Sequence, residues 1–261
     1  MKPQIGLKVW STNLNYLKPA HDLYAQGIYE FIEMYIVPGS FKDSAKLWQE
    51  LHIPMRFHAP HEINLAQRDK QKKNLELCEE LKDFSQLLKA ESIVFHPGLG
   101  GDLKSTLIQL PLVKQRIITS ILIENMPYIS LEDDVCPGSV YEDVAKLIEK
   151  CQVGFCFDIC HAIKTAVYLN RDIKKFAEQF IDLKPEIIHL SDGHLNSIYD
   201  EHLSVGQGEF DLSWMSDVVC QSRCRFLVLE TTKSSLDNLD DFHRDALQVK
   251  SLFEEKISSG R

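Results

Sequence analysis

The stretch FCFDICHA (155–162) is an apolar, β-prone run that ends in a carboxylate, Asp158, followed three residues later by an imidazole, His161. Two explanations fit such an ending. Asp158 caps a following helix while His161 is a hydrogen-bonded core residue, or both belong to a functional site at the end of a strand. The first explanation suffices for one isolated pair. The choice therefore depends on how the other β-prone runs of the chain end.

Eight short β-prone runs recur along the chain, and segments with helical periodicity separate them. The runs are QIGLKVW (4–10), FIEMYIV (31–37), MRFHAPH (55–61), SIVFHPG (92–98), ILIENMP (121–127), VGFCFDI (153–159), EIIHLSD (186–192) and FLVLETT (226–232). Amphipathic periodicity predicts helices at 40–52, 67–90, 139–150 and 236–256. Strands that alternate with helices predict a parallel sheet, and eight units in 261 residues have the size of a closed (β/α)8 TIM barrel. We therefore predict an α/β fold with a single domain over residues 1–261.

Composition narrows the class of protein further. The formal net charge is −9, which argues against a broad electropositive face that holds nucleic acid by counterion release. The longest apolar runs are strand-sized, and the N-terminus has no signal-peptide core, so we expect no membrane association. Seven cysteines are an odd number in a chain too large to need disulfide bonds. They predict reduced thiols and a cytoplasmic location.

Six of the eight runs end in a side chain that can bind a metal ion. These residues are His58, His96, Glu124, Asp158, His189 and Glu230. Because side chains alternate along a strand, all six are expected to point into the barrel, together with the residues two positions earlier: Val94, Leu122, Cys156, Ile187 and Val228. Arg56, two positions before His58, does not fit this apolar interior. The carboxyl ends of the strands are where TIM-barrel enzymes place their chemistry.

Several carboxylates and imidazoles at one barrel mouth would repel one another or stay desolvated unless a cation bound them. His, Asp and Glu donors without thiolate suit Zn²⁺, Mn²⁺ or Fe²⁺. Asp200 and His202 lie one residue apart in the loop after the seventh run, where extended backbone would let them chelate one ion with His161. Asp158 and His161 are then expected to face different ions, which explains why both follow the same strand.

Seven motifs carry a resemblance to a known family. They are HAPHEINLA (58–66), FHPG (95–98), IEN (123–125), GFCFDICHA (154–162), HLSD (189–192), DEHLSVGQG (200–208) and LET (229–231). With these motifs the chain resembles endonuclease IV (AP endonuclease family 2), within the xylose isomerase-like TIM barrels. The resemblance implies up to three zinc ions: His58 and His96 for one, Asp158, His189 and Glu230 for a second, Glu124 bridging these two, and His161, Asp200 and His202 for the third.

The resemblance implies hydrolysis of a phosphodiester, at abasic sites during DNA repair or in a related phosphoester. Water attacks phosphorus in line with help from the metal ions, Glu230 orients that water, and Glu124 bridges two ions. The loops VWSTNLNYLKP and YIVPGSFKD lack the glycines and the Arg- and Gln-bearing segment with which this family penetrates DNA. His61 stands where the family has Tyr, and Met126, Pro127 and Tyr128 replace glycines. DNA is therefore a disfavoured partner, whereas the metal site is retained.

Sugar isomerases and epimerases of the same superfamily provide the alternative function. They hold a single Mn²⁺-type ion with counterparts of Glu124, Asp158, His189 and Glu230, and often carry a further glutamate where this chain has Glu33. A one-metal isomerase has little use for His58, His96, Asp200 and His202, so we favour phosphoester hydrolysis. The substrate class is thus a phosphoester or a sugar. Trp10, at the end of the first run, either lines the pocket or plugs the barrel.

Overall fold

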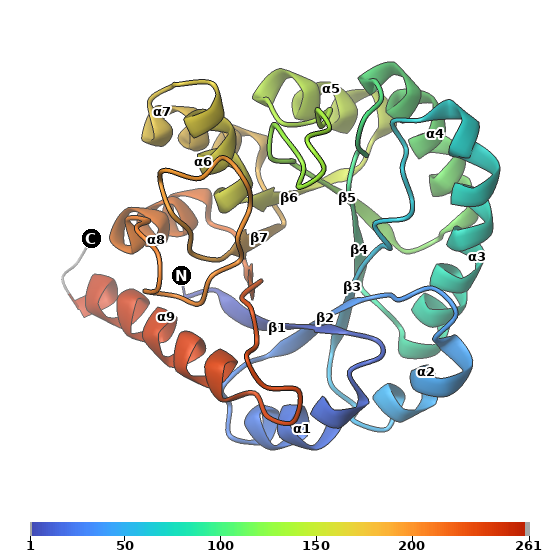
Figure 1. Cartoon of the computed structure of the whole chain (residues 1–261). Helices are drawn as coiled ribbons and strands as arrows, with labels where there is room; N and C mark the ends of the chain where they lie inside the picture. Colours follow the sequence, from blue (N-terminus) through green and yellow to red (C-terminus); the bar gives the residue numbers. More distant parts are fainter. Residues whose placement is uncertain (1, 259–261) are drawn as a thin grey trace.

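The computed structural model describes residues 2–258, and eight parallel strands form a closed barrel at its centre (Figure 1). The strands are β1 (Gln4–Trp10), β2 (Phe31–Tyr35), β3 (Met55–His58), β4 (Ser92–Phe95), β5 (Ser120–Glu124), β6 (Gly154–Asp158), β7 (Ile187–Leu190) and β8 (Phe226–Leu229). Each strand pairs with its neighbour in sequence, and β8 pairs with β1 to close the ring. The predicted (β/α)8 barrel is confirmed. Residues 1 and 259–261 of the predicted domain lie outside the described residues.

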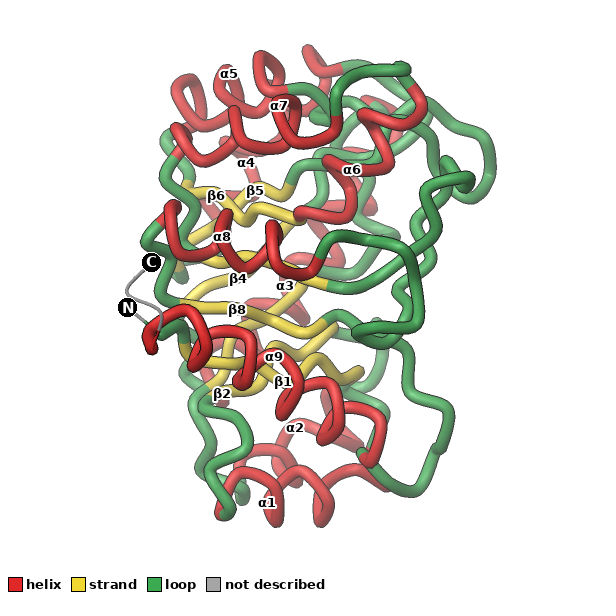
Figure 2. Tube along the Cα trace, turned by 90° about the vertical axis from the view of Figure 1, so that its left-hand side faces the viewer, coloured by secondary structure: helices red, strands yellow, loops and turns green. Residues whose placement is uncertain are grey.

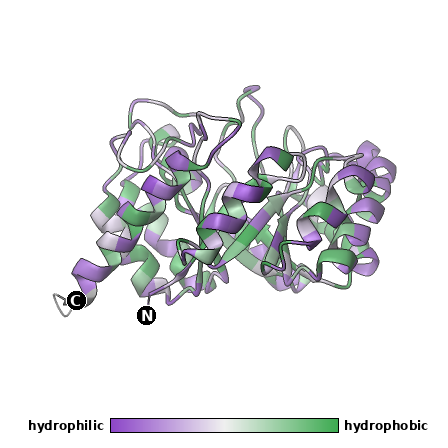
Figure 3. Ribbon diagram, turned by 90° about the horizontal axis from the view of Figure 1, so that it is seen from below, coloured by the Kyte–Doolittle hydropathy of each residue, from purple (hydrophilic) through white to green (hydrophobic). Residues whose placement is uncertain are grey.

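Helices surround the barrel and cover the outer faces of the strands (Figures 1 and 3). They are α1 (Leu17–Ala25), α2 (Phe41–Gln49), α3 (Gln71–Leu88), α4 (Leu103–Arg116), α5 (Tyr141–Cys151), α6 (Ile159–Tyr168), α7 (Ile173–Glu178), α8 (Leu212–Ser222) and α9 (Asp240–Ser258), with short 3-10 turns at Leu14–Tyr16, Arg68–Lys70 and Gln179–Leu183. All four stretches predicted as helical contain a helix. Aspartate side chains accept a backbone hydrogen bond at the first turns of α4, α6, α7 and α8, which fixes where these helices begin.

The barrel is filled with side chains and is therefore not a pore. Its interior contains a compact apolar cluster, separate from the larger core between strands and helices. The members of the interior cluster are Phe31, Val94, Leu122, Cys156, Ile187 and Val228. Five of these six were predicted from strand alternation. Polar side chains at the strand ends must therefore lie above this plug, at the carboxyl-terminal mouth.

Arg56 closes the opposite, amino-terminal end of the barrel. Its guanidinium carbon lies 3.6 Å from the centroid of the Phe226 ring, a cation–π contact. Nη1 donates a hydrogen bond of 2.9 Å to the Ser92 hydroxyl, and Nη2 pairs with Glu91. Arg56 thus seals the barrel floor as a paired cation, which explains its unexpected position in an apolar interior.

The longest connections gather at the carboxyl end of the strands, as predicted for active-site loops (Figure 2). One follows β5 and covers residues 125–140, and the other follows β7 and covers 191–211. The Tyr199 hydroxyl in the second loop donates a hydrogen bond of 2.6 Å to Asp133 in the first. The two loops are therefore held together beside the mouth.

The structure also describes the state of the cysteines and the apolar character of the helices. The seven cysteines are all free thiols, six of them buried. Among the helices of residues 2–258, none combines the length and apolar character that a membrane-spanning helix needs.

Candidate metal centre

Glu124, the last residue of β5, lies at the centre of the mouth and its side chain is fully buried. Its Oε2 lies 3.2 Å from Nε2 of His58 and 3.3 Å from Nε2 of His96. Its Oε1 lies 3.2 Å from Nδ1 of His189 and 3.5 Å from Nδ1 of His161. The two oxygens of one carboxylate therefore face different sets of imidazoles, which is the arrangement that a ligand bridging two ions requires.

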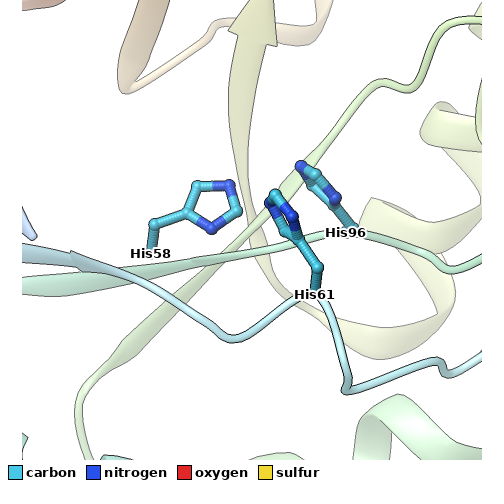
Figure 4. A group of neighbouring side chains, drawn as sticks. All are labelled: His58, His61 and His96. Atoms are coloured by element: carbon cyan, nitrogen blue, oxygen red, sulfur yellow. The ribbon is translucent and has the colours of Figure 1, made fainter. Parts of the chain in front are cut away.

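Three histidines form the first group of possible ligands, and Figure 4 shows their rings close together. One nitrogen from each of His58, His61 and His96 lies within 4.8 Å of the others. Nδ1 of His58 is 2.9 Å from the Ala59 carbonyl, so it donates there and leaves the Nε2 lone pair free. Burial lowers the pKa of His96 to about 4, and the pKa of His61 is lowered by partial desolvation of its ring and by the neighbouring His96 and His58. Both rings are therefore neutral at pH 7, which is the form that binds metal.

His61 was not among the predicted ligands. Its ring stacks on His96 with a centroid distance of 4.8 Å and an interplanar angle of 13°. The motif HAPH places a second imidazole three residues after His58, and this spacing was the available signal. The expected Tyr is thus replaced by a residue able to join the first group.

A second group comprises Glu124, Asp158, His189 and Glu230, whose ligand atoms all lie within 4.8 Å of one another. Oδ1 of Asp158 accepts the backbone N–H of His161 at 2.7 Å and caps α6, so Oδ2 is left for another partner. Asp158 therefore combines both explanations considered for the FCFDICHA stretch: it caps a helix and also reaches the mouth.

Glu230 provides a test of whether a cation fits this group. Its Oε2 is buried without a hydrogen bond, although Nδ1 of His189 is only 2.8 Å away. Nε2 of His189 lies 2.9 Å from Glu33 and donates its proton there, so Nδ1 presents a lone pair to Glu230. Two lone pairs that face each other in a buried site need a cation, which is either a metal ion or a proton on His189. A divalent ion therefore fits the donors of the second group.

The third group, His161, Asp200 and His202, converges on Asp200. Its Oδ2 lies 3.3 Å from Nε2 of His161 and 2.6 Å from Nε2 of His202. The Nδ1 atoms of the two rings face backbone carbonyls of Asn125 and Glu230 at 2.8 and 2.9 Å, which leaves both Nε2 atoms available. All nine residues predicted as ligands thus lie at one mouth, and metal binding by them stays a prediction.

The predicted extended backbone at 200–202 is wrong. His202 has φ of 49°, in the left-handed region. The reason is that the next residue, Leu203, forms two backbone hydrogen bonds of 2.9 and 3.0 Å with Asp192, so the chain must turn at His202 to reach this bridge. Such a conformation costs of order 1 kcal/mol in a non-glycine residue and is common where a side chain must be aimed at a site.

Proton uptake is the alternative to metal binding at this mouth. Burial raises the pKa of Asp158 to about 6, with Glu124 adding to the rise. Burial alone would lower the pKa of His161, but Asp158 and Asp200 raise it well above its usual value. The pKa of His189 is likewise raised, because Glu33 and Glu124 outweigh the effect of burial. A mouth without metal therefore holds protons that metal ions must displace.

Lys8 and Glu33 form a buried ion pair behind the candidate ligands, and Lys8 was not singled out from the sequence. Lys8 Nζ lies 2.7 Å from Glu33 and 3.1 Å from Glu230. The two residues face each other in the β1–β2 register. Glu33 also accepts from His189, so it is engaged on both sides. A lysine in the middle of the apolar run QIGLKVW was the signal that could have indicated this pair.

Two cavities open onto these groups. The apolar cavity, about 240 Å³, has an apolar wall that consists of Ile63, Leu99, Met126, Pro127, Ile129 and Leu131, and candidate ligands such as His96 and Asp200 line another part of it. The aromatic cavity, about 500 Å³, is lined by residues that include Lys8, Trp10, Tyr16, Tyr35, Lys233 and Leu236. Trp10 therefore lines a pocket and does not plug the barrel.

Comparison with known proteins identifies the family. The model of the family described as xylose isomerase-like TIM barrel matches residues 29–252, and the chain belongs to this family. Among curated proteins it is similar to "Probable endonuclease 4" of Methanosphaera stadtmanae, at 28% identity over 192 residues that cover 65% of this chain and 67% of the relative. The resemblance found in the sequence motifs is thereby confirmed.

Solved structures with the same fold include proteins named for both candidate functions. Endonuclease IV from Thermus thermophilus superposes with a TM-score of 0.71 at 17% identity, covering 97% of this chain and 100% of that one. A D-tagatose 3-epimerase-like protein superposes with a TM-score of 0.70 at 18% identity, covering 98% and 97%. These likenesses establish the barrel, and the choice of reaction depends on the site.

Proposed function

We propose that this protein is a metal-dependent phosphodiester hydrolase with zinc as its preferred ion. The observation that carries the proposal is the position of Glu124, whose Oε2 faces His58 and His96 while its Oε1 faces His189. This arrangement suits neighbouring ions, and ions of this kind clamp the attacking and leaving oxygens of a phosphoryl group. The similarity to proteins named "Probable endonuclease 4" supports the same reaction class.

Bound ions would act as Lewis acids toward the phosphate. They would also lower the pKa of bound water, so that it becomes a nucleophile near neutral pH. The residues that would hold them are His58, His96, Glu124, Asp158, His161, His189, Asp200, His202 and Glu230, with His61 as an additional donor of the first group. Within the chain, Lys8 fixes one oxygen of Glu230 at 3.1 Å, while the other has no hydrogen bond. Glu230 is thus held in place to orient water, and Glu124 is placed to bridge two ions.

The isomerase alternative has one structural argument in its favour, the glutamate on β2. Glu33 is fully buried, however: Lys8 bonds its Oε1, and Nε2 of His189 lies within 3.1 Å of both of its oxygens. An acid–base catalyst must reach the substrate, and Glu33 has no free position from which to do so. The alternative also leaves the Asp200 and His202 pair without a role. We therefore rank sugar isomerisation second.

The rim of the mouth favours a small substrate over duplex DNA. The exposed segment LEDDV (131–135) contributes Glu132 to the wall of the apolar cavity and Asp133 to the contact with Tyr199. Carboxylates at this position repel a phosphate backbone, and the net charge of −9 adds to the repulsion. We propose a small phosphodiester as substrate, with DNA as the partner to be tested against it.

The deciding experiment combines metal content with hydrolysis. Protein purified without chelator is analysed for bound metal and assayed with bis(p-nitrophenyl) phosphate and with an abasic-site duplex. We expect about three ions per chain, turnover of the small diester and loss of turnover after chelation. A single ion per chain, with epimerisation of ketoses and no diester hydrolysis, would establish the isomerase instead. Efficient cleavage of the duplex would overturn the small-substrate proposal.

A further inference from the structure

The candidate metal centre lies between two cavities of different chemistry. The apolar and aromatic cavities share His61, Leu131, His202 and Glu230, so they meet at the ligand groups. A phosphodiester carries two ester groups that point away from phosphorus. With phosphorus at the metal centre, each cavity is placed to receive one of these groups. Because their linings differ, the two ester groups are expected to differ as well.

The aromatic cavity presents one exposed aromatic ring, that of Trp10, to its contents. Trp10 is 57% exposed at the mouth, and its ring lies 5.7 Å from that of Tyr35. The other tryptophans, Trp48 and Trp214, are both buried. An exposed indole ring in a cavity is suited to stacking against a planar group such as a nucleobase.

Lys233 adds a positive charge to this cavity that is not used in an ion pair. Its ammonium donates a 2.8 Å hydrogen bond to the Thr231 carbonyl, and within residues 2–258 no carboxylate lies within salt-bridge distance of it. Burial lowers the pKa of Lys233 to about 8, so the ammonium is still the main form at pH 7. The other lysine of the lining, Lys8, is already paired with Glu33 and Glu230. An ammonium with free donors in a cavity is a receptor for an anionic group, because charge-assisted hydrogen bonds are strong there.

From these features we infer that the aromatic cavity binds an ester group with a planar ring and a second anionic substituent. This inference rests on the proposed phosphodiester hydrolysis and names its substrate class. The substrate is an unsymmetrical diester in which the ring stacks on Trp10 and the second anion contacts Lys233. The uncharged partner group occupies the apolar cavity beside Met126 and Ile129.

Binding of thymidine 3′,5′-bisphosphate to zinc-loaded protein tests the inference directly. Because Trp10 is the exposed tryptophan, we expect saturable quenching of tryptophan fluorescence. Calorimetry should show about tenfold weaker binding for Trp10→Ala, the loss of one stacked base. Lys233→Met should weaken the bisphosphate about tenfold but leave thymidine 3′-phosphate unchanged, because only the bisphosphate carries the second anion.

The matched control is Lys42→Met, which removes an exposed lysine of α2 and should leave both affinities unchanged. Absence of quenching, or equal binding by wild type and Lys233→Met, would overturn the cavity assignment. Failure of the proposed function gives a different pattern. Lys233-dependent binding without hydrolysis of bis(p-nitrophenyl) phosphate would leave the cavity assignment standing and remove the hydrolase. Hydrolysis without Lys233-dependent binding would remove only the cavity assignment.

Discussion

The two ends of the barrel differ in how their buried charged groups are paired. At the floor, Arg56 is stacked on Phe226 and bonded to Ser92 and Glu91. At the mouth, an oxygen of Glu230 is buried without a hydrogen bond beside imidazoles whose lone pairs point inward. The charge at the floor is paired by other residues of the chain, whereas the donors at the mouth need either bound protons or a metal ion.

The floor of the barrel therefore contributes to stability, and the mouth contributes to function. A buried charge that is fully paired within the chain is compatible with a stable fold and needs no external ligand. A cluster of ligand atoms left unpaired is costly to fold, and that cost is recovered when an ion binds to the native state. Changes at the floor should therefore alter unfolding, and changes at the mouth should alter metal content and turnover.

The largest effect is expected from Glu124→Gln. The substitution keeps the shape but removes the charge that faces both sets of imidazoles, so neighbouring ions are no longer bridged. Diester turnover should fall by at least about a hundredfold, comparable to loss of a key electrostatic group. Metal analysis and steady-state kinetics measure the outcome. Glu91→Gln at the floor is the matched control and should retain both metal content and turnover. Equal loss in the two variants would contradict the assignment of function to the mouth.

The pH dependence of metal binding should be the next largest effect. Because the folded-state pKa values of His161 and His189 are raised above 6.5, their protons stabilise the metal-free protein below that pH. That stabilisation is lost as the pH rises through the raised values. Each displaced proton should weaken metal binding about tenfold per unit of falling pH. Calorimetry in buffers of different ionisation enthalpy counts the released protons; pH-independent binding would argue against these histidines as ligands.

A smaller effect is expected from Lys164→Met, which acts on the mouth indirectly. Lys164 is buried one turn after His161 and donates to the carbonyls of His194 and Ser197 and to Glu201, at 2.8, 3.1 and 2.6 Å. It thereby holds the loop that carries the third ligand group. Affinity for the third ion should fall about tenfold, as for other supporting contacts of metal ligands. Metal titration measures this, and exposed Lys72→Met should change nothing.

The smallest effect on the site is expected from Arg56→Met. The variant loses the cation–π contact and the bonds at the floor, while Glu91 is exposed enough to regain water. The free energy of unfolding should fall by about 1–2 kcal/mol. Denaturant unfolding of the metal-loaded protein measures the loss. A change in metal content would show that floor and mouth are coupled.

The sequence by itself determined the barrel and the set of candidate ligands. Apolar periodicity distinguished strands from helices, and alternation along each strand told which side chains point inward, as for Glu124 and Asp158. Both properties are local, because they depend on backbone geometry over a few residues. These properties explain why the strand-end residues lie at one mouth, whereas their division into three groups came from the resemblance to endonuclease IV.

Only the tertiary structure decided how these side chains meet. Strand register places Lys8 opposite Glu33. The turn at His202 depends on pairing between Leu203 and Asp192. Arg56 contacts Phe226 across the floor of the barrel. These contacts join residues far apart in sequence, and closure of the barrel sets the distances between them. Periodicity specifies the face on which a side chain lies, whereas the partner it meets on that face depends on how the whole chain packs.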